Sequence, residues 1–94
     1  MLITRFRKST DFTTRAPDTK REYIRYLDQI REKFGQLSLD ELQQTATRGG
    51  FKEWRDSMGR TPRAADYAWM MLARVLSVAK DRGTLAVNIC ERGG

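Results

Sequence analysis

The segment from Thr61 to Gly83, TPRAADYAWMMLARVLSVAKDRG, constrains the fold most, because its pattern predicts one long helix that is apolar around most of its circumference. Its apolar positions, spaced by three and four, are Ala65, Ala68, Trp69, Leu72, Val75, Leu76 and Ala79, and Tyr67, Met70, Met71 and Val78 widen this stripe. Such a helix has to be surrounded by other elements. We therefore expect it to be the central helix of a small bundle.

Both ends of this helix carry recognisable signals. Thr61 can cap the first turn with its hydroxyl, and Pro62 suits the first helical position, where a missing N–H costs nothing. Gly83 supplies a residue for the left-handed conformation that closes many helices. Lys80 and Arg82 lie in the last turn, where positive charge is favourable.

The first third of the chain predicts two further helices. Residues 1–8 place Leu2, Ile3 and Phe6 at helical spacing, and residues 9–16 form a linker, rich in Ser and Thr, that Phe12 anchors to the core. The next helix begins near Asp18 or Thr19, either of which can cap it, and runs to Phe34, with Gly35 as its stop. Its buried stripe is Tyr23, Ile24, Leu27, Ile30 and Phe34.

The segment between these long helices is less regular. Ser38 and Glu41 form a capping box for a short helix, the stretch TATRGG at 45–50 is a break, and residues 51–58 form a further short helix that ends at Gly59. After Gly83 the tail is irregular, and its alternating Leu85, Val87 and Ile89 are expected to lie along the bundle. No strand pairs are evident, so the predicted class is all-α.

Composition narrows the possible functions. Ninety-four residues suffice for one domain, and 18 Lys and Arg against 12 Asp and Glu give a net charge of +6, which favours polyanionic partners such as nucleic acid. No apolar run approaches the roughly 18 residues of a membrane span, so we expect no membrane partner. The single cysteine, Cys90, excludes an internal disulfide and favours a reducing, cytoplasmic setting.

Residues for catalysis are scarce. The chain has no histidine, which excludes His-based acid–base chemistry and most zinc sites, and it has no glycine-rich phosphate loop. Cys90 lacks a His partner and is expected to be a spare thiol in the tail. Trp54 and Trp69 each fall on an apolar stripe and are expected in the core. We expect no catalytic residue, no metal and no cofactor, hence no enzyme activity in this chain.

Three segments follow one another in the chain: TKREYIRYLDQIREKFGQLSLDEL, FKEWRDSM and TPRAADYAWMMLARVLSVAKDRGTLAVNIC. Their order resembles that of the N-terminal core-binding domain of phage-type tyrosine recombinases (integrases). The resemblance covers about residues 1–92. Its matching positions are Thr19, Tyr23, Leu27, Phe34, Gly35, Leu37, Leu42, Trp54, Arg55, Ala65, Leu72, Ala79, Arg82, Gly83, Leu85 and Asn88. The chain departs from the family at Ile89, where proline is usual, and in its short first helix.

The resemblance implies a four- to five-helix orthogonal bundle of the SAM-like type over residues 1–92, with residues 93–94 beginning a linker to an absent catalytic domain. It implies a bacterial or phage-encoded cytoplasmic protein that grips duplex DNA during integration and recombination. The implied partners are double-stranded DNA, the C-terminal catalytic domain of the same polypeptide and other recombinase protomers on DNA. In this family the nucleophilic Tyr and its Arg, Lys and His neighbours lie in that catalytic domain.

Phosphate contacts from Lys, Arg and helix N-termini dominate affinity for DNA, so the candidate DNA-binding residues lie at helix starts and on polar helix faces. They are Lys20, Arg21, Lys52, Arg55, Arg60, Thr61, Arg63 and Arg74. Lys52 and Arg55 are expected on the polar side of their helix, and Arg74 lies three turns along the polar line of the long helix. The cluster at 55–63, around the start of the long helix, is the main candidate. Arg31, Lys33 and Arg92 are expected to be solvated only.

Two alternatives remain open. The segment FKEWRDSMGRTPRAADY can form the helix, turn and helix of a DNA-binding regulator, although a recognition helix needs a broader polar face than residues 64–79 offer. A helical protein-interaction domain with incidental positive charge is the other alternative. Tight binding to an operator by a dimer favours the regulator, and failure to bind duplex DNA at low salt favours the interaction domain.

Overall fold

The structure is a computed structural model, and it describes residues 2–58 and 61–90. Within these ranges it contains five α-helices, one short 3-10 helix and no strand, so the all-α prediction is confirmed for the described part of the chain. In chain order the elements are α1 (Leu2–Lys8), α2 (Thr10–Thr13), α3 (Pro17–Phe34), the 3-10 helix η1 (Glu41–Gln43), α4 (Thr45–Ser57) and α5 (Pro62–Asp81).

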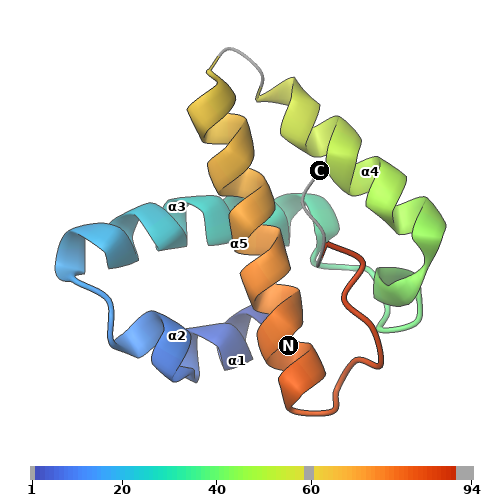
Figure 1. The fold of residues 1–94 in the computed structure, drawn as a ribbon, viewed down its shortest axis with the longest axis horizontal. Coiled ribbons are helices and arrows are strands. Elements are labelled where there is room, and N and C mark those ends of the chain that lie inside the picture. Colours follow the sequence, from blue (N-terminus) through green and yellow to red (C-terminus); the bar gives the residue numbers. More distant parts are fainter. Residues whose placement is uncertain (1, 59–60, 91–94) are drawn as a thin grey trace.

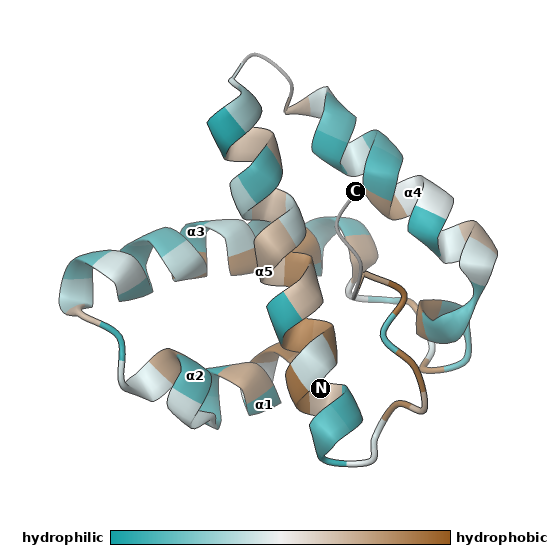
Figure 2. Cartoon of the chain, viewed as in Figure 1, coloured by the Kyte–Doolittle hydropathy of each residue, from teal (hydrophilic) through white to brown (hydrophobic). Residues whose placement is uncertain are grey.

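The long helix α5 is the centre of the bundle, as predicted. It contacts α1, α3 and α4, and Figure 1 shows α3 crossing behind it while α1 and α2 lie on one side and α4 on the other. Its buried residues are Ala68, Trp69, Met71, Leu72, Val75, Leu76 and Ala79. Figure 2 shows this hydrophobic run along α5, which lies against the other helices. The core is therefore built around the second to fifth turns of one helix.

The C-terminal end of α5 follows the sequence signals closely. Gly83 has φ +77°, the N–H of Gly83 donates to the carbonyl of Lys80 (3.0 Å), and the N–H of Thr84 donates to the carbonyl of Ala79 (2.9 Å). These two hydrogen bonds define a Schellman motif. At the other end Pro62 occupies the first helical position, but the hydroxyl of Thr61 makes no capping hydrogen bond, so that predicted contact is wrong.

The predicted linker at residues 9–16 instead contains α2. The buried Ser9 donates its hydroxyl to the carbonyl of Phe6 (2.5 Å), and the N–H of Thr13 donates to the carbonyl of Ser9 (2.9 Å). Phe12 is buried, as expected of an anchor, and its ring lies 6.2 Å from that of Phe6. Ser and Thr usually favour loops, but here their hydroxyls bond the backbone of the same turn.

Helix α3 begins earlier than predicted. Its N-cap is Ala16 and its first residue is Pro17, so neither Asp18 nor Thr19 caps it. The fixed φ of proline suits the first helical position, and proline removes one of the N–H groups that would otherwise lack a partner there. The predicted end at Phe34 is confirmed, and a Cβ at Gly35 would overlap the carbonyl oxygen of Arg31, which explains the glycine.

The segment 38–58 differs most from prediction. The capping box forms, because the N–H of Glu41 donates to Ser38 Oγ and the N–H of Ser38 donates to Glu41 Oε1, each at 3.1 Å. It opens only the single 3-10 turn η1. The predicted break at 45–50 is wrong, because α4 starts at Thr45 and continues through Gly49 and Gly50. The predicted stop at Gly59 lies outside the described residues.

The tail after α5 folds back against α4 and α5 (Figure 1). Asn88 is buried, its side-chain amide donates to the carbonyl of Ala73 (3.0 Å), and its Oδ1 accepts from the N–H of Cys90 (2.8 Å). Leu85 is buried and Ile89 partly buried, as predicted, whereas Val87 is 46% exposed. Cys90 is a free thiol, as predicted, and it is fully buried.

Candidate nucleic-acid interface

The predicted DNA-binding residues lie at separate places on the bundle. Lys20 and Arg21 are near the start of α3, and Lys52 and Arg55 are in the second half of α4, on the opposite side of α5 in Figure 1. Thr61 and Arg63 are at the start of α5, Arg74 is past its middle, and Arg60 lies outside the described residues. The full list thus does not form one cluster.

The start of α5 carries two exposed members of this set. Thr61 and Arg63 are exposed, and with Ala64 and Tyr67 they line a shallow groove of about 350 Å³ against Glu22 and Tyr26 of α3. The first N–H groups of a helix have no partner within the helix and carry partial positive charge. In α5, however, Pro62 has no N–H, and the N–H groups of Ala64 and Ala65 donate to the carbonyl of Thr61 (3.0 and 3.3 Å). This end of α5 therefore offers a ligand the exposed side chain of Arg63 rather than a row of free backbone donors.

Arg55 packs on the core more than the sequence suggested. Its Cζ lies 5.1 Å from the ring centroid of Trp69, its side chain is 18% exposed, and it pairs with Asp56 at 3.3 Å. The Cζ of Arg48 lies at the same distance, 5.1 Å, from that ring. Arg48 also donates to the carbonyl of Ile89 in the tail. The predicted position of Arg55 on a polar face is thus wrong, because its guanidinium contacts the buried indole ring.

Lys20, Arg21 and Lys52 occupy less constrained positions. Lys20 places its Nζ 5.9 Å from the ring centroid of Phe12, which connects α3 to α2. Arg21 is exposed and pairs with Asp18 one turn earlier. Lys52 is half-buried on α4. The cationic groups of these three residues are not brought to one position by the fold.

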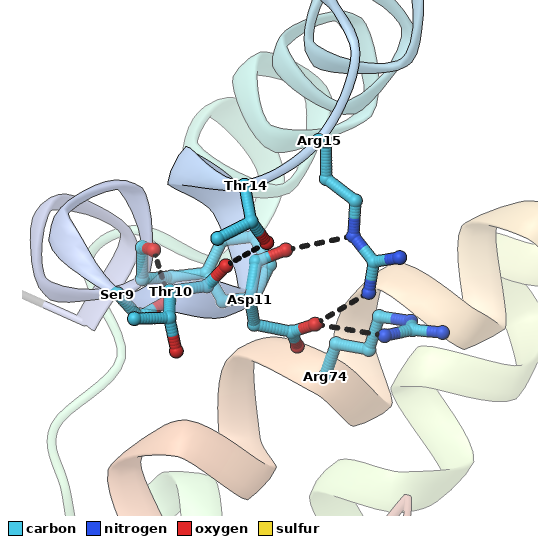
Figure 3. Close-up of polar contacts among 7 residues, drawn as sticks. Ser9, Thr10, Asp11, Thr14, Arg15 and Arg74 are labelled. Carbon is cyan, nitrogen blue, oxygen red and sulfur yellow. Dashed lines mark hydrogen bonds and ion pairs between the residues drawn. The ribbon is translucent and has the colours of Figure 1, made fainter.

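Arg74 belongs to a compact charged cluster with Asp11 and Arg15. Asp11 Oδ1 accepts from Arg15 Nη2 at 2.7 Å and from Arg74 Nη1 at 2.9 Å, while Arg15 Nε donates to the backbone carbonyl of Asp11 at 2.9 Å. Figure 3 shows both guanidinium groups converging on this carboxylate, one from the loop that follows α2 and the other from α5. The cluster carries two positive charges and one negative charge.

Two pKa shifts reflect this environment. The hydrogen bond to Asp11, followed by charge interaction with Tyr23, raises the pKa of Arg15 above its usual value, so Arg15 stays charged. Burial, followed by interaction with Tyr23, raises the pKa of Tyr67, whose ring lies 4.8 Å from that of Tyr26. Tyr67 is therefore a neutral phenol at physiological pH, packed among the aromatic rings between α3 and α5.

Sequence reasoning missed the roles of Arg48, Asp11 and Arg15. Arg48 and Arg55 are seven residues apart, which is two turns of helix and places them on one face. Because a break was predicted at 45–50, they were not assigned to the same helix. Asp11 and Arg15 are four residues apart, the spacing of a helical ion pair, but the segment was assigned to a linker. A helical assignment of both segments would have revealed these pairs.

Comparisons with known proteins do not identify a family for this chain: no protein-family model, no curated protein and no solved structure matches it. Among the described helices, none has both the length and the hydrophobicity to cross a membrane. Within the same residues, no group of three or more His, Cys, Asp or Glu side chains lies together as a metal site would require.

Proposed function

We propose that this chain is the DNA-binding module of a phage-type tyrosine recombinase, with a SAM-like fold, which grips duplex DNA at core-type sites while a following catalytic domain cleaves and rejoins the strands. The observation that carries the proposal is the exposed start of α5, where the side chains of Arg63 and Thr61 lie at the surface, at the positive end of the helix dipole, in a domain with net charge +6. The resemblance of residues 1–92 to that domain supports the choice of family.

The module contributes binding and orientation, and the chemistry belongs to the catalytic domain. Its partners are double-stranded DNA, that domain and other protomers on the same DNA. Because half of a clamp buries little surface, the isolated module should bind DNA weakly, with steep salt dependence and little sequence selectivity.

The distribution of exposure along α5 disfavours a helix-turn-helix regulator. The exposed residues of α5 are Pro62, Arg63, Asp66, Ser77 and Asp81, at its two ends, while its middle is buried or half-buried. A recognition helix needs several side chains along one outer face to reach base edges. The first turn of α5 can contact a phosphate, but its middle cannot enter a major groove.

The test compares two double variants that remove the same formal charge. Arg60→Ala with Arg63→Ala should weaken binding to all duplexes by similar factors and lower the slope of log K against log salt by about 1.8, from about 0.9 per lost phosphate contact. Arg31→Ala with Lys33→Ala, at the exposed end of α3, should leave that slope nearly unchanged. Fluorescence anisotropy of a labelled duplex at several salt concentrations measures both.

Equal slopes for the two double variants would show that the start of α5 is no DNA contact. No binding of the parent chain to duplex DNA at low salt would refute the proposed function itself and favour a protein-interaction domain.

A further inference from the structure

The cluster of Asp11, Arg15 and Arg74 has more hydrogen-bond donors than it uses. A guanidinium group carries five N–H donors. In bonds to described residues, Arg15 uses two nitrogens, Nε and Nη2, and Arg74 uses Nη1, and all three bonds go to Asp11. Arg74 Nε is buried without a hydrogen-bond partner among the described residues. The cluster therefore retains unused donors and a net charge of +1.

The geometry of the cluster is suited to a tetrahedral anion. Both arginines bond the same carboxylate oxygen, Asp11 Oδ1, which fixes their terminal nitrogens close together. In Figure 3 the remaining nitrogens of both groups point away from Asp11. Each side chain is 36% exposed, so an anion from solvent can reach the terminal nitrogens of the two groups, whereas Arg74 Nε is buried. Guanidinium groups favour phosphate because several oxygens can accept from one planar fork.

The cluster lies on nearly the same face of α5 as Arg63 at its start. Arg63 and Arg74 are eleven residues apart, which corresponds to about three turns and roughly 16 Å along the helix, on nearly the same face. Arg15 reaches this face from the loop that follows α2. The two positions can therefore face one ligand as long as a DNA backbone.

We propose that Arg15 and Arg74 together bind one phosphate group of the DNA backbone, and that Asp11 holds the two guanidinium groups in place until the phosphate arrives. This inference rests on the proposed function and adds a second, defined phosphate contact to the one at the start of α5. Asp11 acts as a competitor of the phosphate, so removing its charge should strengthen DNA binding.

The first test uses Asp11→Asn, which keeps the shape of the side chain and removes its charge. The control is Asp28→Asn, which removes the same charge from an exposed position on α3. Asp11→Asn should tighten duplex binding by about fivefold more than the control does, the upper range for an exposed ion pair. If both variants tighten binding equally, only the overall charge matters and the proposed phosphate site is wrong.

The second test removes the cations. Arg15→Gln with Arg74→Gln should lower the salt slope by about 0.9, because one shared phosphate contact is lost. Arg31→Gln with Lys33→Gln removes the same charge and should leave the slope nearly unchanged. Circular dichroism should verify that each variant is folded. The Asp11→Asn comparison remains decisive if the double arginine variant unfolds.

The possible outcomes separate this inference from the proposed function. If the parent chain binds duplex DNA, but the cluster variants have the same salt slopes and affinities as their controls, the phosphate site is wrong and the proposed function stays intact. No duplex binding by the parent chain would overturn both. Stronger binding by Asp11→Asn alone, with a lower slope for the double arginine variant, would support both.

Discussion

Replacing Trp69 tests the architecture most directly, because this residue joins α5 to α4. Its side chain is 6% exposed, and a buried tryptophan removes roughly 150–250 Å² from water, equivalent to about 4–6 kcal/mol at 25 cal/mol per Å². The guanidinium groups of Arg48 and Arg55 over the ring each add about 0.5–1 kcal/mol. The indole Nε1 has no partner among the described residues, which costs about 1–3 kcal/mol.

These contributions are consistent with the usual range for a large buried aromatic residue, so Trp69→Ala should lower the free energy of unfolding by about 3–5 kcal/mol. A domain of this length has a total free energy of unfolding of roughly 5–14 kcal/mol, so the variant should be marginally folded. Its melting temperature should fall by more than about 12 °C, at about 4–8 °C per kcal/mol. Urea and thermal denaturation followed by circular dichroism measure both quantities.

Trp69→Phe is the matched control. Phenylalanine keeps an aromatic face for Arg48 and Arg55 and removes the unpartnered N–H, so the variant should lose less than about 1.5 kcal/mol. A Trp69→Ala variant that melts within about 5 °C of the parent would refute the central position of α5. Equal losses in the two variants would refute the contribution assigned to the aromatic face.

Three further predictions follow from local features. Gly83→Ala should cost about 1 kcal/mol in chemical denaturation, because φ is +77° there, whereas a neutral result would show that the Schellman motif is dispensable. Burial raises the pKa of the Cys90 thiol to about 12, so a thiol reagent at pH 8 should label the native protein far more slowly than the unfolded chain. Because the folded state holds this proton more tightly than the unfolded state, the free energy of unfolding should fall as pH rises from about 9 toward 12. The isolated chain should form no covalent adduct with a nicked duplex, and trapping of one through Tyr23, Tyr26 or Tyr67 would refute its assignment as a non-catalytic module.

The parts of the fold that the sequence predicted well are those where apolar spacing and end signals agree. In α5 the stripe of Trp69, Leu72 and Val75 repeats over several turns, and Pro62 and Gly83 mark its two ends. Local signals of this kind depend only on residues within one helix. The capping box at Ser38 and Glu41 was predictable for the same reason, because both hydrogen bonds lie within four residues.

The parts that the sequence predicted poorly depend on contacts between distant segments. Gly49 and Gly50 each lower helix stability by roughly 0.5–1 kcal/mol, so local propensity favours a break there. The burial of Phe51 against the ring of Phe34, 4.7 Å away, and the contact of Arg48 with Trp69 offset that cost. Tertiary packing thus extends α4 through two glycines.

The same limitation applies to the candidate interface. Sequence reasoning identified Arg63 from its place at a helix start, which is a local property, and the structure places it at the exposed end of α5. It could not separate Arg55, which packs on Trp69, from Arg74, which pairs with Asp11 across 63 residues of sequence. All three are arginines on predicted amphipathic helices, and only the partner brought near by the fold distinguishes them.

The burial of α5 also restricts where a DNA backbone can touch this domain. Because its residues Ala68 to Ala79 form the centre of the core, α5 can offer DNA only its ends and the long side chains at its edges. The N-terminal end carries favourable partial charge for phosphate, and the C-terminal end does not. Along the edge, Arg74 is the one arginine within that buried span of α5, and Arg15 joins it from the segment between α2 and α3. The two proposed contacts, at Arg63 and at the Asp11 cluster, are therefore the positions that the packing of α5 leaves for an anionic ligand on this face.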